Sequence, residues 1–336
     1  MKIPTPKQLP SGSWRVQITK DGKRHSFTAE NPAAAIAAAL DFNGDKKAPQ
    51  GVTLGACIDE YIQLRSSVLS PSTIMAYNSY RSHRFQPYMT RKVAEIDRRT
   101  LQRMVNDEAR QVSAKTVKNA WALVSASLAE YGVDTAGINL PQVPRRERPY
   151  LTGAEILKFC EAVKGEPCEI PALLALCSLR RSEIYALDWS DVDLKHNTIF
   201  VRRATVKGEA GFVTKETTKT ETSTRVVPII IPQLADALKR CDVKCGRVVS
   251  GYPNTLYHQI KRVCAKHGLP DVSPHSLRHS FASLSYELGI NELETMKMGG
   301  WRDLGTMRKI YTHLSERQLS DAAERLTGFF SHFEMG

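Results

Sequence analysis

The stretch from Pro141 to Pro149, which reads PQVPRRERP, excludes one continuous helical or sheet domain for this chain. Proline has no backbone N–H and a fixed φ, so three prolines in nine residues suit neither a helix interior nor a central strand. Directly afterwards, Thr152-Gly-Ala-Glu155 has the capping-box pattern that begins a helix. We therefore interpret residues 141–149 as an interdomain linker and predict a separate domain over residues 150–336.

The residues before this linker divide into two parts. Residues 14–19 alternate apolar and polar side chains, which is the period of a half-buried strand, and Asp21-Gly22 favours a hairpin turn. Asn31-Pro32 then begins an alanine-rich helix. We predict a small sheet-plus-helix module over residues 1–48. Its polar face can lie in a DNA major groove, and the alternative is an ordinary small sheet packed on a helix.

Residues 51–140 show only helical patterns, so we predict a helical domain there. Helices are expected to begin near Leu54, at Ser70-Pro71, at Thr100 and at Ser113. Together with short strands in the last domain, this indicates a mainly α fold with small β-sheets, in the α+β class.

Charge limits the partners of such a chain. Its 336 residues include 47 Lys and Arg against 35 Asp and Glu, a formal net charge of +12, which is typical of proteins that bind nucleic acid. Many soluble proteins are also basic, so charge alone leaves both interpretations open. The basic residues that we predict to contact DNA are Arg15, Lys23, Arg81, Arg84, Lys115 and Lys118.

Other classes of protein are disfavoured. No window approaches the ~18 consecutive apolar residues of a membrane span, and the first residues lack the apolar core of a secretion signal, so we expect a cytoplasmic protein. Seven scattered cysteines do not resemble a disulfide framework. The spacing of Cys241, Cys245, Cys264 and His267 permits a zinc site, but small apolar cysteines are the simpler interpretation, and we expect no metal and no cofactor.

Within the last domain, polar residues occur where a core does not need them. Arg180 and Glu183 lie three apart inside an apolar stretch, and a partly buried arginine needs a partner, for which a phosphate would serve. Residues 198–204 and 225–231 are predicted strands. Between them lies a polar turn with Lys215 and Lys219, which is most often simply solvated.

The stretch SPHSLRHSFA, residues 273–282, places His275 and Arg278 on one face of the first turn of a helix. Backbone N–H groups and the helix dipole favour an anion at that position. A solvated basic helix end is the alternative. Further on, Trp301 follows two glycines and Tyr311 follows a basic segment, although an ordinary core or surface tyrosine is the common case for such a residue.

The order of these residues resembles the tyrosine recombinase family, specifically phage-type integrases, over nearly the whole chain. The motifs are LRRSEIYALDWSDVD (179–193), HSLRHSFAS (275–283) and IYTHL (310–314). The resemblance implies that Arg180, Arg278 and Trp301 bind and activate a scissile phosphate, with Glu183 in support, and that His275 accepts or relays the proton of the nucleophile. It also implies that Tyr311 is the nucleophile and that Lys219, rather than Lys215, is the lysine of the mobile turn.

Two features depart from the family pattern. Ser178 stands where a glycine is usual before the Leu-Arg of the first motif, which predicts a different local turn. Ten positions separate Trp301 from Tyr311, one more than the family spacing, which predicts a one-residue bulge before the tyrosine helix unless another residue takes the place of Trp301.

The resemblance implies integration and excision of phage or mobile-element DNA through a covalent 3′-phosphotyrosyl intermediate, without metal or ATP. The implied partners are double-stranded attachment sites, an accessory DNA-bending protein or excision factor, and three further copies in a tetramer on DNA. A helix predicted from Ser315 onward would dock on a neighbouring copy. The alternatives are a type IB-like topoisomerase and a non-catalytic DNA-binding regulator on the same fold.

Overall fold

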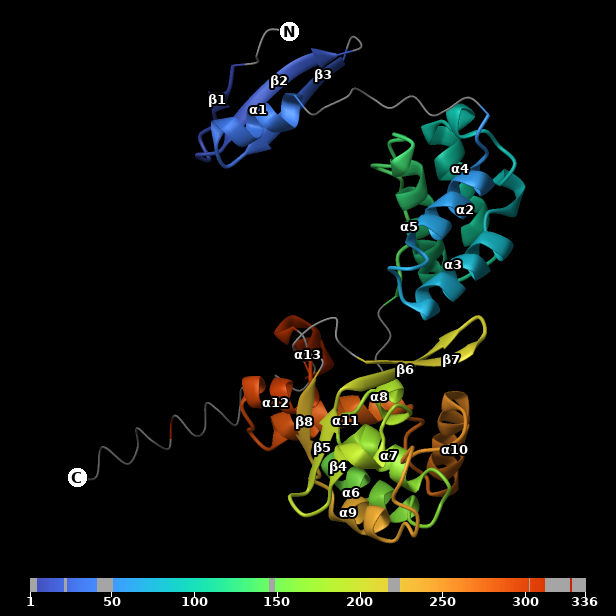
Figure 1. Cartoon of the computed structure of the whole chain (residues 1–336), viewed down its shortest axis with the longest axis vertical. Coiled ribbons are helices and arrows are strands. Elements are labelled where there is room, and N and C mark those ends of the chain that lie inside the picture. Colours follow the sequence, from blue (N-terminus) through green and yellow to red (C-terminus); the bar gives the residue numbers. More distant parts are fainter. Residues whose placement is uncertain are drawn as a thin grey trace, which may run out of the picture. The chain divides into compact units, whose positions relative to one another are not determined.

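A computed structural model describes residues 5–20, 23–40, 51–144, 149–216, 224–301, 303–311 and 327 of the chain. The chain divides into two compact units, Met1–Pro144 and Arg145–Gly336 (Figure 1). Helices predominate and the sheets are small, so the prediction of a mainly α fold with small β-sheets is confirmed.

The first part of the first unit is a three-stranded antiparallel sheet in the order β1-β2-β3, with one helix against it. Strands β2 and β3 pair from Trp14 opposite Ala29 to Lys20 opposite Lys23, so two residues connect them. The alternating apolar residues of β2 face the helix, where Val16, Ala35 and Ala39 are buried. The elements are β1 (Lys7–Gln8), β2 (Trp14–Lys20), β3 (Lys23–Ala29) and α1 (Pro32–Leu40).

The second part of this unit is a helical bundle with its own core. Three of its helices begin at residues whose side chains accept a backbone N–H, which satisfies a donor that the helix leaves unpaired: Thr53, Asp97 and Ser113. The Asp97 cap starts the third helix at Arg98, two residues before the predicted Thr100. The elements are α2 (Leu54–Arg65), α3 (Pro71–His83), η1 (Gln86–Tyr88), η2 (Val93–Glu95), α4 (Arg98–Ala109) and α5 (Ala114–Glu130).

The second unit packs helices around a small antiparallel sheet in the order β4-β5-β8. Helix α7 forms the centre of its core, since every residue from Ala172 to Leu176 is buried. Helices α9 and α11 lie against α7. The first elements are α6 (Gly153–Ala162), α7 (Glu169–Leu176), α8 (Arg181–Ile184), η3 (Trp189–Asp191), β4 (Val192–Asp193), β5 (Thr198–Val201), β6 (Arg203–Gly208), β7 (Gly211–Glu216) and β8 (Arg225–Pro228). The remaining elements are α9 (Pro232–Lys239), α10 (Pro253–Lys266), α11 (Pro274–Glu287), α12 (Glu292–Gly299) and α13 (Leu304–Tyr311).

The segment between β5 and β8 differs from the sequence prediction. Instead of one strand over 198–204 followed by a turn, β5 ends at Val201 and a separate hairpin of β6 and β7 projects from the unit (Figure 1). Lys215 therefore lies exposed in strand β7 rather than in a turn. Cross-strand pairs such as Val206 opposite Val213 and Thr205 opposite Thr214 suit a pleated strand pair, which explains why this polar segment forms a hairpin.

Candidate active site

Arg180 owes its position to a reversal of the chain after α7. Ser178 has a φ of 72°, in the left-handed region that favours glycine, and it is fully buried. The reversal makes Arg180 the residue that precedes α8, where its backbone N–H donates to Glu183 Oε2 at 2.8 Å. The local turn thus keeps the conformation of a glycine even though a serine occupies it.

Glu183 is a buried carboxylate that accepts four hydrogen bonds from two arginines. Its Oε1 accepts from Arg180 Nη1 at 2.6 Å and from Arg225 Nη1 at 3.1 Å, while its Oε2 accepts from the Arg180 backbone and from Arg225 Nη2 at 2.9 Å. Burial raises the pKa of this carboxyl, but the hydrogen bond and charge of Arg225 and the charge of Arg180 outweigh it and hold the pKa below its ordinary value. Glu183 is therefore ionised at neutral pH.

Arg278 lies on α11 with only 2% of its surface exposed. Its Nη1 donates to the Ser178 carbonyl, its Nη2 donates to the Gly300 carbonyl at 3.4 Å, and its guanidinium carbon lies 4.1 Å from the centre of the Trp301 ring. Burial and the charge of Arg180 lower the pKa of Arg278, with a smaller contribution from Arg225, and the charge of Glu183 opposes them. A buried cation with so little compensation favours a nearby anion.

The sequence Gly299-Gly300-Trp301 ends α12 and supplies the acceptor at the centre of the site. Gly300 has a φ of 63°, and its carbonyl accepts from both Arg180 Nη2 and Arg278 Nη2. A side chain at Gly299 would overlap the Trp301 ring, since a Cβ would lie 1.7 Å from it. The Trp301 ring therefore packs directly against the Gly299 backbone. It also contacts Arg278 and stacks on the Phe281 ring, with 6.2 Å between the ring centroids.

His275 lies in the first turn of α11, one turn before Arg278, and is exposed. Its ring lies edge-on to His279, with 4.5 Å between centroids. Tyr311 is the last residue of α13, a helix that packs against α11 and α12. The side chain of Tyr311 and the whole of Lys219 lie outside the described part of the chain.

Helix α13 is held in two ways. Met307 is fully buried in a cluster with Phe281 and Trp301, so the apolar face of the helix packs on the residues that support Arg278. On the exposed side, Arg308 donates to both carboxylate oxygens of Glu292 at the start of α12, at 2.7 to 3.2 Å. The predicted site residues Arg180, Glu183, Arg278 and Trp301 are thus in contact with one another or with Gly300.

The predicted DNA-binding residues of the first unit differ in how they are used. Arg81 donates to Asp59 at 2.9 Å and Arg84 to the buried Glu108 at 3.1 Å, so both take part in ion pairs within the helical bundle. Lys115 is exposed near the start of α5, and Lys118 is half-buried one turn later. In the small sheet, Arg15 is half-buried on β2 opposite Thr28, and Lys23 is the first residue of β3, with a side chain that is not described.

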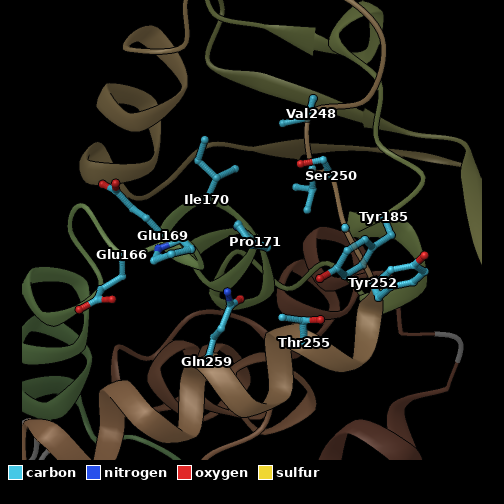
Figure 2. Close-up of a pocket in the computed structure, with 13 residues that line it drawn as sticks. Glu166, Glu169, Ile170, Pro171, Tyr185, Val248, Ser250, Tyr252, Thr255 and Gln259 are labelled. Atoms are coloured by element: carbon cyan, nitrogen blue, oxygen red, sulfur yellow. The ribbon is translucent and has the colours of Figure 1, made fainter.

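A cavity among the described residues lies elsewhere in the second unit (Figure 2). It has a volume of about 410 Å³ and is lined by residues of α7, α10 and the segment before α10, including Glu169, Ile170, Tyr252 and Gln259, and by Tyr185 after α8. Of the predicted catalytic residues whose side chains the structure describes, none lines it. Within the described residues there is no cluster of three or more His, Cys, Asp or Glu that could hold a metal ion.

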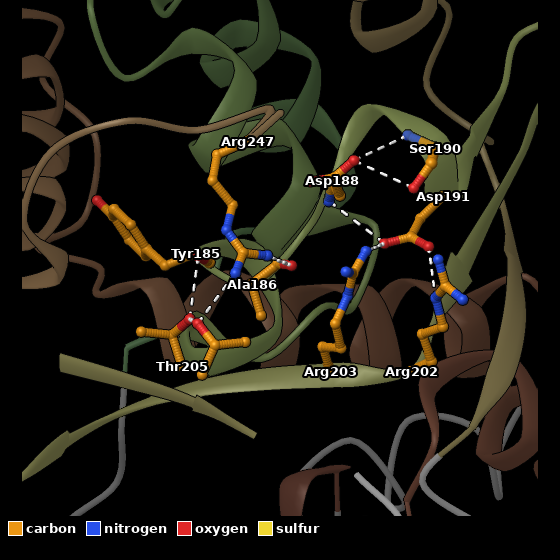
Figure 3. Close-up of polar contacts among 10 residues, drawn as sticks. Tyr185, Ala186, Asp188, Ser190, Asp191, Arg202, Arg203, Thr205 and Arg247 are labelled. Atoms are coloured by element: carbon orange, nitrogen blue, oxygen red, sulfur yellow. Dashed lines mark hydrogen bonds and ion pairs between the residues drawn. The ribbon is translucent and has the colours of Figure 1, made fainter. Parts of the chain in front are cut away.

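A second buried carboxylate anchors the β6–β7 hairpin at its base (Figure 3). Asp191 accepts from Arg202 Nε at 2.7 Å and from Arg203. Nearby, the Thr205 hydroxyl donates to the Tyr185 carbonyl at 3.1 Å, at the end of α8. The short helix α8 is therefore held at its first end by the arginine cluster and at its last end by the hairpin.

Arg225 is the member of the arginine cluster that the sequence prediction missed. It is the first residue of β8, only 7% of its side chain is exposed, and both of its Nη atoms donate to Glu183. The signal in the sequence was an arginine at the start of a strand whose next residues are Val, Val and Pro. An arginine at the end of a strand is normally solvated, so this pattern alone indicates nothing about the site.

Comparisons with known proteins identify the family of the chain. Residues 150–318, about half of the chain, match the phage integrase family. A XerC-like tyrosine recombinase of Caldanaerobacter subterraneus is 26% identical over 329 residues, covering 84% of each chain. The integrase of Staphylococcus phage L54a is 31% identical over 177 residues, which cover 45% of this chain and 50% of that integrase.

Solved structures share the fold at low sequence identity. The Tn1549 transposon integrase in complex with transposon right end DNA is 16% identical and has a TM-score of 0.66, over 82% of this chain and 100% of that one. A lambda integrase tetramer bound to a Holliday junction is 18% identical with a TM-score of 0.57, over 92% of this chain and 95% of that one.

Fold, site and relatives together define the class of tyrosine recombinases, enzymes that transfer DNA strands. Because the family match spans half of its length, the chain belongs to the phage integrase family. No helix among the described residues is both long and apolar enough to cross a lipid bilayer.

Proposed function

We propose that the protein is a site-specific recombinase that cuts and rejoins DNA through a covalent 3′-phosphotyrosyl intermediate on Tyr311. Its biological reaction would be the integration and excision of phage or mobile-element DNA. The observation that carries the proposal is the meeting of Arg180 and Arg278 at one carbonyl oxygen, that of Gly300. Two guanidiniums that can reach the same acceptor can also bind the oxygens of one phosphate.

In this proposal the arginines stabilise the transition state. A phosphodiester resists nucleophiles because its oxygens are anionic, and charge accumulates on them as the attacking oxygen approaches. Arg180 is 40% exposed on its side chain and can rotate from Gly300 to a phosphate, while Arg278 is fixed by Ser178 and Trp301. Trp301 has a double role: its ring face supports Arg278, and its indole N–H donates to a non-bridging oxygen.

The covalent step conserves the energy of the phosphodiester. The Tyr311 oxygen forms a bond to phosphorus, its proton passes to His275, and the bond from phosphorus to the 5′ oxygen breaks. The leaving 5′ oxygen takes a proton from Lys219. Attack by the 5′ oxygen of a second DNA end reverses these steps, so no metal or ATP is consumed.

We further propose that residues 1–48 bind arm-type DNA sites and that residues 51–140 bind core sites. Lys115 supports this assignment for the bundle because it is exposed and forms no ion pair among the described residues, whereas Arg81 and Arg84 contribute to DNA binding only if their ion pairs open. Assembly into a tetramer on DNA through the residues after Ser315 is proposed by analogy with the lambda integrase tetramer. An accessory DNA-bending protein or excision factor would set the direction.

Trapping a covalent adduct tests the proposal. The protein would be incubated, with EDTA present, with randomly nicked fragments of DNA from its source, because a nick near the cleavage site lets a short strand diffuse away and leaves the adduct. Adducts that resist SDS would be digested and their peptides mapped. We expect DNA on Tyr311, none with Tyr311→Phe, and a normal amount with Tyr252→Phe, which changes an exposed tyrosine away from the site.

The opposite result would identify an alternative. Salt-sensitive DNA binding with no adduct in the wild-type protein would favour a non-catalytic regulator. An adduct on Tyr311, in a protein that relaxes supercoiled DNA without exchanging strands, would favour a type IB-like topoisomerase.

A further inference from the structure

We propose that Arg225 is a positioning residue for DNA cleavage: it neutralises Glu183 so that Arg180 remains available to the scissile phosphate. This inference rests on the proposed function, because it concerns the same reaction. Arg225 does not reach the substrate in this role, since both of its Nη atoms are engaged by the carboxylate.

The geometry of Glu183 shows how the two arginines share one carboxylate. Each oxygen accepts one hydrogen bond from Arg180 and one from Arg225, so all four in-plane positions of the carboxylate are filled. Arg225 binds end-on through both of its Nη atoms, a bidentate arrangement that adds both energy and geometric specificity. Arg180 gives Glu183 only Nη1 and its backbone N–H, and its Nη2 points to Gly300.

Burial makes this division necessary. Glu183 is 5% exposed and Arg225 is 7% exposed, whereas Arg180 is 40% exposed. A buried carboxylate requires a cation close to it, because water cannot stabilise its charge. Arg225 is the buried cation that stabilises Glu183, and in the proposed reaction it does not bind the substrate. Without Arg225, the only other arginine in contact with Glu183 in the described part of the chain is Arg180, and the carboxylate would compete with DNA for it.

Arg225 is also packed so that it cannot readily move. It begins β8, in register with Val201 of β5, and α12 lies against β8. Its guanidinium fills the space beside Gly300, where a Cβ would lie 2.5 Å from Arg225 Nε. The residue therefore joins the sheet, the carboxylate and the turn whose carbonyl both catalytic arginines contact.

The test measures single-turnover cleavage of nicked attachment-site DNA, recovered in the trapping experiment, by full-length variants. We expect Arg225→Gln to lower the cleavage rate by about 10- to 100-fold, which is the usual effect of losing a partner that orients a functional group. Its affinity for the same DNA should change less than about threefold, because most contacts with the DNA backbone lie outside the site. Arg225→Lys keeps the charge but loses the bidentate geometry, so its cleavage rate should lie between those of the wild type and Arg225→Gln.

The chain offers a matched control in Asp191 (Figure 3). This carboxylate is also buried and is also shared between a more exposed arginine, Arg202, and a less exposed one, Arg203. Arg203→Gln removes the same kind of ion pair from the same unit, at a carboxylate whose partners are Arg202 and Arg203 rather than Arg180 and Arg225. We expect it to lower thermal stability about as much as Arg225→Gln, while cleavage by the folded protein stays close to that of the wild type.

A double variant separates positioning from a general structural role. If Arg225 acts by neutralising Glu183, then Arg225→Gln combined with Glu183→Gln should cleave several-fold faster than Arg225→Gln alone, since the unpaired charge is gone. A double variant that is slower than Arg225→Gln, or an Arg225→Gln variant that cleaves like the wild type, would overturn the inference. Absence of a tyrosyl adduct in the wild type would instead refute the proposed function.

Discussion

Replacing Gly300 by alanine is the most direct perturbation of the arginine cluster, and Gly289 provides its control. Both glycines follow helices and both are left-handed, with φ of 63° and 70°. Alanine at either position costs about 1–2 kcal/mol for the left-handed backbone. A Cβ at Gly289 meets nothing within 4 Å, so this backbone cost is the whole expected effect there.

At Gly300 the new Cβ would lie 2.5 to 2.7 Å from three atoms of Arg225. Arg225 is buried and cannot move away without separating from Glu183, and breaking a buried ion pair costs about 3–5 kcal/mol. Adding the backbone cost, we expect Gly300→Ala to destabilise the second unit by about 4–7 kcal/mol. At about 2–4 °C per kcal/mol for a unit of this size, its melting temperature should fall by about 10 °C or more, against a few degrees for Gly289→Ala.

Differential scanning calorimetry of the full-length protein would measure both variants, since it can resolve the transitions of separate units. Cleavage should fall strongly in Gly300→Ala even at temperatures where the unit is folded, because the carbonyl and Arg225 are both displaced. Equal melting temperatures for the two variants would refute the reasoning, because they would mean that Arg225 has room to move.

Three further predictions concern the same cluster. Ser178→Gly should raise the melting temperature by a few degrees without loss of cleavage. The change removes left-handed strain of about 1–2 kcal/mol and a buried hydroxyl with no hydrogen-bond partner among the described residues, while the Ser178 carbonyl that binds Arg278 remains. A lower melting temperature would contradict this prediction. Inorganic phosphate should stabilise the wild-type second unit, by about 2.7 kcal/mol at 100 times its dissociation constant, and Arg278→Gln should abolish the effect in calorimetric titrations. The pKa of Glu183 in the folded protein lies below the ordinary 4.5, so the ionised carboxylate stabilises the fold above that pH, and this stabilisation is lost as the pH falls further. The difference in melting temperature between the wild type and Glu183→Gln should therefore shrink between about pH 6 and pH 3.

Much of the architecture follows from local signals in the sequence. The helix starts at Ser70, Ser113 and Thr152 are marked by capping residues or by proline, and each of these helices begins where the pattern indicates. The strand pair at the start of the chain follows from apolar alternation around Asp21-Gly22. Such signals act over a few residues, so a single sequence contains them in full.

The hairpin of β6 and β7 was missed because its pairing depends on the whole fold. Its strands contain threonine, lysine and glycine, which are equally suited to a solvated turn, and only a few apolar residues. Contacts with the rest of the unit decide between the two, such as that of Thr205 with the Tyr185 carbonyl and that of Arg247 with Thr214 at 3.0 Å. A local sequence pattern cannot show that Thr214 is held by Arg247, which lies 33 residues further along the chain.

In the site, the residue types were predictable but their partners were not. Arg180 and Glu183 are three residues apart, and helix periodicity correctly places them together. The partner that completes Glu183 comes from 42 residues further on, and the acceptor that joins Arg180 to Arg278 is a backbone carbonyl 120 residues from Arg180. A backbone carbonyl carries no signal in a sequence, because every residue has one.

The charges around Gly300 explain why this cluster is suited to bind and release DNA in turn. Three guanidiniums, those of Arg180, Arg225 and Arg278, surround one ionised carboxylate, so the cluster has a net charge of +2 before substrate binds. Burial and, after it, the charge of Arg180 lower the pKa of Arg278, so the fold holds this buried cation at a cost in free energy. A phosphodiester contributes one negative charge in the ground state and more in the transition state, so its binding relieves the excess most when the attacking oxygen has begun to bond. In the proposed reaction, Arg278 would therefore stabilise the transition state more than the free enzyme.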